Sequence, residues 1–379
     1  MIKNYSDSKN NLTFFDKFKS LNLVIIILIA VLASIGFVML YSVSGGSADP
    51  WMRQQILRFS FGFLVMIGIA FIDLRLWLSL SYPIYFFSLL LLVGVELFGT
   101  IGMGAQRWID LGFFHLQPSE IMKIALVMAL ARYFHSISYD DVRSIKWIIP
   151  PILMIIVPSS LVLIEPDLGT AILLILEGTI ILFIVGARWW KFIFVSLVAV
   201  ALAPFFWTKL HSYQQNRILT FFNPERDPLG AGYHIIQSKI AFGSGGVWGK
   251  GYLLGTQSHL NFLPEKHTDF IFTTLAEEFG LIGGLIVLSI YICLIVYSYA
   301  ISIRSRSSFG RILGIGITST FFLYIFINIS MVMGLIPVVG VPLPLISYGG
   351  TAIVTILFSF GLLLSIHINR NIYISKSLN

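Results

Sequence analysis

Long apolar stretches recur from one end of the chain to the other, and they constrain its fold more than any other feature. Each stretch is about 20 residues long and carries few or no charges, which matches an α-helix that crosses a bilayer. The sequence therefore predicts an all-α polytopic membrane protein with ten transmembrane helices, in which residues 1–379 form a single integral membrane domain. The ten stretches are residues 21–43, 54–72, 76–98, 119–137, 147–164, 168–187, 189–208, 270–301, 312–336 and 351–368.

The composition excludes several other classes of protein. Hydrophobic residues make up 57% of the chain and charged residues 11%, whereas a soluble domain carries roughly a quarter charged residues. The stretches do not alternate apolar and polar residues, so they do not fit the strands of an outer-membrane barrel. The single cysteine, Cys293, cannot form an intrachain disulfide, and no cysteine–histidine spacing typical of a zinc site is present.

The positive charges predict how the chain is oriented. With the N-terminus inside, fifteen Lys and Arg residues fall on the inner side and four on the outer side; six more lie in the long connection 209–269, where the positive-inside rule has little force. We therefore expect residues 1–20 to be a cytoplasmic N-terminal segment, 209–269 a large periplasmic loop and 369–379 a cytoplasmic tail. Basic residues in short loops also explain the pI near 9.4 without a nucleic-acid partner.

Three predicted outer connections have unusual sequences. The first covers residues 99–118. In the second, 209–269, the segment KLHSYQQNRILTFF predicts a surface helix and YHIIQSKIAF an amphipathic interfacial helix. The third, IPVVGVPLPLISYGG, has three prolines and cannot be a continuous helix. At membrane depth such backbone is tolerated only against protein or a wet cavity.

Ionisable residues cluster in the stretch LPEKHTDFIF, just before the eighth predicted span. If a helix begins near His267, then Asp269, Thr273 and Glu277 lie on one face of it. A carboxylate at the water–lipid boundary usually marks a functional site. Equally, an acid at a helix N-terminus is favoured by the helix dipole alone. The residues by themselves leave both interpretations open.

A second group of charges opens the fourth predicted span. Glu120 and Lys123, three residues apart after Pro118, share a helix face and can pair, which would lower the cost of placing both in the membrane. Arg107, beside Trp108, could hold a phosphate or anchor the chain at the interface.

Other charged or glycine-rich segments give weaker signals. Turn chemistry is sufficient to explain EPDLGT, with Glu165 and Asp167. Glu96 and Glu177 lie within spans and need partners that the sequence does not identify. GSGGVWGK does not match a nucleotide-binding P-loop, because Ser244 stands where the first glycine is required.

Several of these segments together resemble the SEDS family (shape, elongation, division and sporulation). They occur in the family's order, cover nearly the whole chain and favour the elongation branch over the division branch. The ten-span outline matches that family as well. The matching segments are GAQRWIDLG, QPSEIMK, EPDLGT, DPLGAGYHIIQSKIAFGSGG, GTQSHLNFLPEKHTDFIF and PVVGVPLPLISYGGT.

The resemblance implies a peptidoglycan glycosyltransferase that polymerises lipid II on the outer face of the bacterial cytoplasmic (inner) membrane. The implied partners are a class B penicillin-binding protein, the elongation machinery and undecaprenyl-pyrophosphate-linked glycan. By the family's motifs, Asp269 is the essential acid, and Glu120 and Lys123 line the same cavity.

These residues support a hypothesis for an inverting transfer. Asp269 is the candidate general base for the sugar hydroxyl. Lys123, Arg107 and Arg217 are the cations available to the pyrophosphate leaving group, and His267 is a further candidate for substrate binding. A divalent cation, Mg²⁺ or Mn²⁺, could share this role, with Asp269 as its one candidate ligand.

Two other classes of function remain as alternatives. A flippase for lipid-linked oligosaccharides would also need many spans and intramembrane charges, but transporters often show internal repeats, and none is visible. A scaffold that only recruits the elongation machinery would not need a carboxylate at Asp269.

Overall fold

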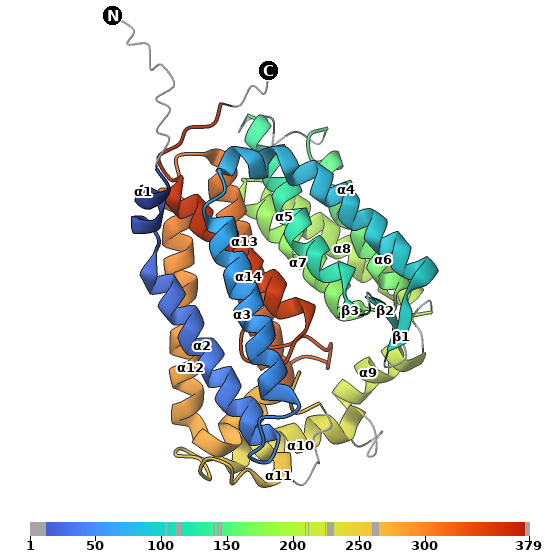
Figure 1. The fold of residues 1–379 in the computed structure, drawn as a ribbon. Coiled ribbons are helices and arrows are strands. Elements are labelled where there is room, and N and C mark those ends of the chain that lie inside the picture. Colours follow the sequence, from blue (N-terminus) through green and yellow to red (C-terminus); the bar gives the residue numbers. More distant parts are fainter. Residues whose placement is uncertain are drawn as a thin grey trace, which may run out of the picture.

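The computed structural model is built almost entirely of helices (Figure 1). It describes residues 13–102, 105–110, 112, 115–138, 141, 144, 146–208, 210, 212–223, 225, 231–259 and 265–375. The ends of the two predicted cytoplasmic segments, and parts of the 209–269 connection, lie outside these residues.

In the described part of the chain, ten helices follow the ten apolar stretches, which confirms the all-α polytopic architecture. Among the described residues, five helices (α2, α4, α12, α13 and α14) are long and apolar enough to cross a membrane, and three shorter apolar helices lie at Ile149–Ile164, Leu168–Ile184 and Trp189–Phe205. The ten helices are α2 (Leu23–Val43), α3 (Trp51–Ala70), α4 (Leu74–Phe98), α5 (Pro118–Ser136), α6 (Ile149–Ile164), α7 (Leu168–Ile184), α8 (Trp189–Trp207), α12 (Ile271–Arg304), α13 (Ser308–Val332) and α14 (Thr351–Ile368).

Short elements fill the connections. Both helices expected in the 209–269 connection are present, as α9 (Ser212–Phe222) and α10 (Ala231–Ser244), and Figure 1 shows them beneath one end of the bundle. The first outer connection forms three short antiparallel strands that the sequence did not predict. These elements are α1 (Phe14–Lys19), α11 (Thr256–His259), β1 (Thr100–Gly102), β2 (Ala105–Asp110) and β3 (His115–Leu116).

Helix α5 lies at the centre of the bundle, and its side chains from Pro118 to Ala131 are almost all buried. Close approach between helices is possible where small residues meet, which is how membrane helices pack without a hydrophobic driving force. At the contact of α3 with α14, a Cβ on Gly62 would lie 2.7 Å from Leu357 Cδ1, and one on Gly361 would lie 2.8 Å from Met66 O.

The segment 336–350 between α13 and α14 is not helical, as its prolines predicted. Side chains from four different helices donate to four of its carbonyl groups, as irregular backbone at membrane depth requires. The donors are Gln55 of α3 to Ser347 (2.9 Å), Tyr291 of α12 to Pro344 (2.5 Å), Asn328 of α13 to Val341 (2.7 Å) and Arg217 of α9 to Val338 (3.3 Å).

Helix α12 is interrupted at Gly280, where the segment 246–251 is inserted against its backbone. Gly280 has φ +64° and ψ −162°, a conformation that is essentially restricted to glycine. The interruption frees backbone groups that the inserted segment then binds. The bonds are Lys250 N to Glu277 O (3.0 Å), Gly251 N to Glu278 O (3.0 Å), Leu281 N to Gly246 O (2.9 Å) and Ile282 N to Val247 O (3.2 Å).

Gly280→Ala is expected to lower the free energy of unfolding by at least ~2 kcal/mol, because the added Cβ would be strained and would displace hydrogen-bonded backbone. That Cβ would lie 2.4 Å from Gly249 N and 2.5 Å from Val247 O. Thermal unfolding in detergent measures the effect. Gly68→Ala in α3, where a Cβ meets nothing within 4 Å, is the control. Equal midpoints for the two variants would contradict this account of the interruption.

Candidate functional site

Asp269 lies in a turn that precedes α12, so the condition for a shared helical face, a helix start near His267, is not met. The helix begins at Ile271, because residues 265–270 close a turn in which the N–H groups of Thr268 and Phe270 both donate to Glu265 O, each at 3.2 Å. Asp269 is therefore not on a helical stripe with the residues that follow it. Its side chain is half-buried.

Three consecutive carbonyl groups of this turn are bound from outside it. The carbonyl of His267 accepts from Tyr348 N at 2.9 Å. That of Thr268 accepts from Ser347 Oγ at 2.6 Å, and that of Asp269 accepts from Asn328 Nδ2 at 2.9 Å. A net contribution of about 1 kcal/mol is typical of each such bond. The peptide that carries Asp269 is thus fixed to the segment 336–350 and to α13.

Burial raises the pKa of the Asp269 carboxyl to about 7. The negative charges of Glu265 and Asp167 raise the pKa further, while the positive charges of Arg217 and Arg107 oppose this shift. A carboxyl with a pKa near neutral exists in both protonation states at physiological pH. It is therefore suited to accept a proton and then release it.

Two of the predicted cations are near Asp269 and are held by backbone carbonyls. Arg107, on β2, donates to Pro166 O in the α6–α7 turn, and its Nε lies 3.7 Å from Asp167 Oδ2. Arg217, on α9, donates to Val338 O. Both charges act on the Asp269 carboxyl. The structure thus brings Asp269, Arg107 and Arg217 into one electrostatic neighbourhood.

The segment EPDLGT forms the turn between α6 and α7, and its aspartate caps the second helix. The Asp167 carboxylate accepts hydrogen bonds from Thr170 N at 3.2 Å and Thr170 Oγ1 at 2.9 Å, and so caps α7. Glu165 is buried beside it. Burial raises the pKa of Glu165 to about 8, with further contributions from the negative charges of Asp167 and Glu96.

His267 packs on α3. Its ring stacks on Trp51 with centroids 4.0 Å apart, and Tyr348 lies 5.9 Å away. Burial lowers the pKa of His267, so the ring is neutral at pH 7. The ring of His267 therefore packs the turn against α3. Its role in substrate binding stays a prediction.

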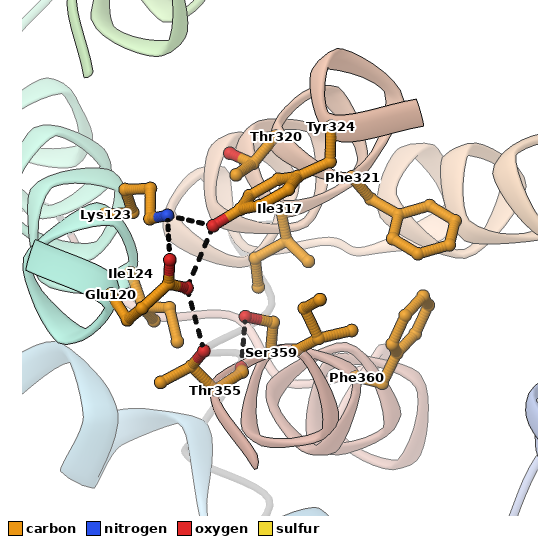
Figure 2. A pocket seen from close by; sticks show the side chains of 11 residues that line it. Glu120, Lys123, Ile124, Ile317, Thr320, Phe321, Tyr324, Thr355, Ser359 and Phe360 are labelled. Carbon is orange, nitrogen blue, oxygen red and sulfur yellow. Dashed lines mark hydrogen bonds and ion pairs between the residues drawn. The ribbon is translucent and has the colours of Figure 1, made fainter. Parts of the chain in front are cut away.

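Glu120 and Lys123 form the predicted pair, buried at the start of α5 (Figure 2). Lys123 Nζ lies 2.6 Å from Glu120 Oε1 and also contacts the hydroxyl of Tyr324. Glu120 Oε2 in turn accepts from Tyr324 Oη at 2.9 Å and from Thr355 Oγ1 at 3.3 Å. The ammonium is therefore enclosed by groups of its own chain.

The pocket beside this pair is small. It has an open volume of about 30 Å³, and Ile317, Phe321 and Phe360 line its apolar side. That volume is room for about one water molecule, not for a sugar. Asp269 is not among the residues that line it. The expectation that Glu120 and Lys123 share a cavity with Asp269 is thus not met by this pocket.

Several uncharged residues of the site were missed in the sequence. Tyr324 and Asn328 lie one turn apart on α13 and serve the two groups: Tyr324 contacts Glu120 and Lys123, while Asn328 binds the Asp269 peptide. Nothing in an apolar stretch distinguishes them from packing residues. Glu177, for which the sequence suggested no partner, accepts from Thr320 Oγ1 at 2.8 Å.

The fit of a divalent cation can be tested against the carboxylates. Among the residues that the structure describes, no three His, Cys, Asp or Glu side chains gather in a way that could hold a metal ion. A metal cage made by the protein alone therefore does not fit here.

Comparisons with known proteins agree with the geometry. The profile of a family described as "Cell cycle protein" (FtsW/RodA/SpoVE) matches residues 22–372. The chain is 46% identical over 376 residues to "Peptidoglycan glycosyltransferase MrdB" of Escherichia coli K12, covering 98% of this chain and 100% of MrdB.

Two solved structures have the same fold. One, described as "Structural coordination of polymerization and crosslinking by a peptidoglycan synthase complex", has a TM-score of 0.80 and 29% identity, with 93% of this chain and 98% of that chain covered. The crystal structure of Thermus thermophilus RodA has a TM-score of 0.70 and 27% identity with the same coverage. The chain therefore belongs to the FtsW/RodA/SpoVE family, which the sequence motifs indicated as the SEDS family.

Proposed function

We propose that this protein is a peptidoglycan glycosyltransferase that polymerises lipid II at the outer face of the bacterial inner membrane. One observation carries the chemistry: a half-buried carboxyl with a pKa near 7, Asp269, is held in a fixed turn within the field of Arg107 and Arg217. Relatives whose names state this activity support the reaction class.

In the proposed step, the Asp269 carboxylate removes the proton from the 4-hydroxyl of the acceptor N-acetylglucosamine. The hydroxyl oxygen forms a bond to the anomeric carbon of the donor strand, and the bond from that carbon to the diphosphate oxygen breaks, with inversion. The electron pair leaves with undecaprenyl diphosphate, and protonated Asp269 then releases its proton to water. No covalent enzyme intermediate is needed.

Positive charge near the leaving group stabilises the transition state. Arg107 and Arg217 are the cations that act on the Asp269 carboxyl, so they are the groups we assign to the diphosphate. Lys123 is less suited, because its ammonium is bound to Glu120 and Tyr324 in a pocket of about 30 Å³.

The membrane arrangement and partners belong to the same proposal. Both termini face the cytoplasm, as the distribution of Lys and Arg predicts, which places Asp269 on the periplasmic side. The polymerised strands then pass to a class B penicillin-binding protein for crosslinking. The fold shared with a peptidoglycan synthase complex, which coordinates polymerization and crosslinking, supports such a partner.

The two alternative functions, a flippase and a scaffold, predict different properties. A flippase must pass a sugar headgroup through the bundle, whereas the buried polar pocket beside Glu120 has only about 30 Å³ of open volume. Lipid II supplied on the periplasmic side distinguishes the classes, since a polymerase makes glycan there and a flippase makes none. A scaffold would tolerate any change at Asp269 that leaves the complex intact.

Asp269→Asn is expected to lower glycan polymerisation by about 10²–10⁴-fold while the protein stays folded and bound to its partner, because the amide cannot act as a base. Polymerisation of lipid II by the purified complex measures this. Glu265→Gln, in the same turn, is the matched control: it should retain most activity at pH 8, with its acid limb moved to lower pH because a negative charge that raises the pKa of Asp269 is removed. Normal polymerisation by Asp269→Asn would show that the base is another group.

The pH dependence follows from the pKa of about 7 for Asp269. The base acts when deprotonated, so kcat/KM should fall as the pH is lowered through 7, by about tenfold per pH unit below it. An ordinary aspartate would keep the rate constant down to about pH 5. A profile that is flat between pH 8 and pH 5 would contradict the assigned pKa.

Lys123→Met is expected to cost roughly 3–5 kcal/mol of stability, because the buried carboxylate of Glu120 is left without its ion pair. The double variant Glu120→Gln, Lys123→Met should recover much of the stability and the activity, since neither charge then remains buried. Thermal unfolding and polymerisation are measured on both. Full loss of activity in a stable double variant would instead assign Lys123 to the phosphate.

A further inference from the structure

We propose that Asn328 is a positioning residue for this reaction: its amide fixes the peptide that carries Asp269, and with it the direction of the Asp269 carboxylate. The inference rests on the proposed role of Asp269 as the base. Asn328 lies on α13 and is fully buried, at 0% exposure. It belongs to none of the sequence motifs that indicated the function.

The amide of Asn328 bridges two segments that meet at Asp269. Nδ2 donates to Asp269 O at 2.9 Å and to Val341 O at 2.7 Å. Carbonyl oxygens only accept hydrogen bonds, so both N–H groups of the amide must face them, and this fixes the orientation of the amide. A carboxylate or an aliphatic side chain at this position could not make these bonds.

The segment that contains Val341 forms one wall of the space around the Asp269 carboxylate. Gly340, next to Val341, faces the Asp269 side chain, and a Cβ there would be in van der Waals contact with Oδ2 at 3.5 Å. Asn328 therefore holds both the backbone of Asp269 and the backbone that faces its carboxylate. It is the side chain that joins these two backbones at Asp269 itself.

The carbonyl oxygen of the Asn328 amide indicates that stability of packing alone does not explain an asparagine at this position. Its Oδ1 is buried and has no hydrogen-bond partner within the described part of the chain. An unsatisfied buried acceptor is destabilising, and an apolar residue of the same size would avoid that cost. Such local violations are expected at functional sites, where geometry outweighs stability.

The test compares two buried asparagines. Asn369, at the end of α14, also donates to two backbone carbonyls, Ser365 O at 2.9 Å and Ile72 O at 3.4 Å, but far along the helix from the Asp269 turn. The variants are Asn328→Leu and Asn369→Leu in the partner-bound protein. Turnover at saturating lipid II, KM, the pH–rate profile and the unfolding midpoint are measured for each.

For Asn328→Leu we expect turnover to fall about 10- to 100-fold with KM changed by less than about two-fold, as for a reacting group displaced by about 1 Å. The acid limb of its pH–rate profile should move to lower pH. The Asp269 carboxyl is no longer fixed by the Asn328 hydrogen bonds, so it reaches water more easily and its pKa falls. Asn369→Leu should keep both the wild-type turnover and the wild-type acid limb.

Two results would overturn the inference. One is wild-type turnover and an unchanged acid limb in folded Asn328→Leu; the other is a loss of turnover in Asn328→Leu that is fully explained by a lower folded fraction. If Asn328→Leu does not fold, Ser347→Ala tests whether bonds to the turn position Asp269, since it removes the hydrogen bond to the Thr268 carbonyl. Ser347→Ala should lower turnover with KM unchanged. Unchanged turnover would contradict the positioning of Asp269 by these bonds.

The outcome is separable from that of the proposed function. An active Asp269→Asn protein would refute the base, whatever Asn328 does. An inactive Asp269→Asn protein together with a fully active Asn328→Leu protein would refute only the positioning role.

Discussion

The irregular segment 336–350 is the constraint on which the site depends. Backbone carbonyls at membrane depth have no water to bind, so each needs a donor from the protein. Helices α3, α9, α12 and α13 all supply donors to this segment, and the segment in turn holds the turn of Asp269 through Ser347 and Tyr348. Satisfying this backbone therefore also positions the proposed base.

The buried pair Glu120–Lys123 and the carboxyl of Asp269 have different surroundings. Glu120 and Lys123 are neutralised against each other and against Tyr324, which makes their burial tolerable and ties α5 to α13. Asp269, in contrast, has no ion-pair partner within hydrogen-bonding distance among the described residues, and burial raises its pKa to about 7 against the opposing charges of Arg217 and Arg107.

Features that arise from local pattern could be predicted, and those that arise from tertiary contacts could not. The ten helices follow from apolar length, the break at residues 336–350 from its prolines, and the Glu120–Lys123 pair from helical spacing. The bonds that fix the turn of Asp269 come from distant residues, and the interruption at Gly280 depends on an inserted loop. Asn328 and Tyr324 acquire their roles only through partners that the fold brings to them.

The central claim is that a clamped carboxylate at Asp269 faces the acceptor sugar. It is tested most directly by a structure of the partner-bound protein with lipid II and an unreactive donor analogue. The account predicts the acceptor 4-hydroxyl oxygen within about 2.6–3.2 Å of an Asp269 carboxylate oxygen, or joined to it by one water, with the donor anomeric carbon beyond it. An Asp269 carboxylate directed at the diphosphate, with the 4-hydroxyl against another residue, would contradict it.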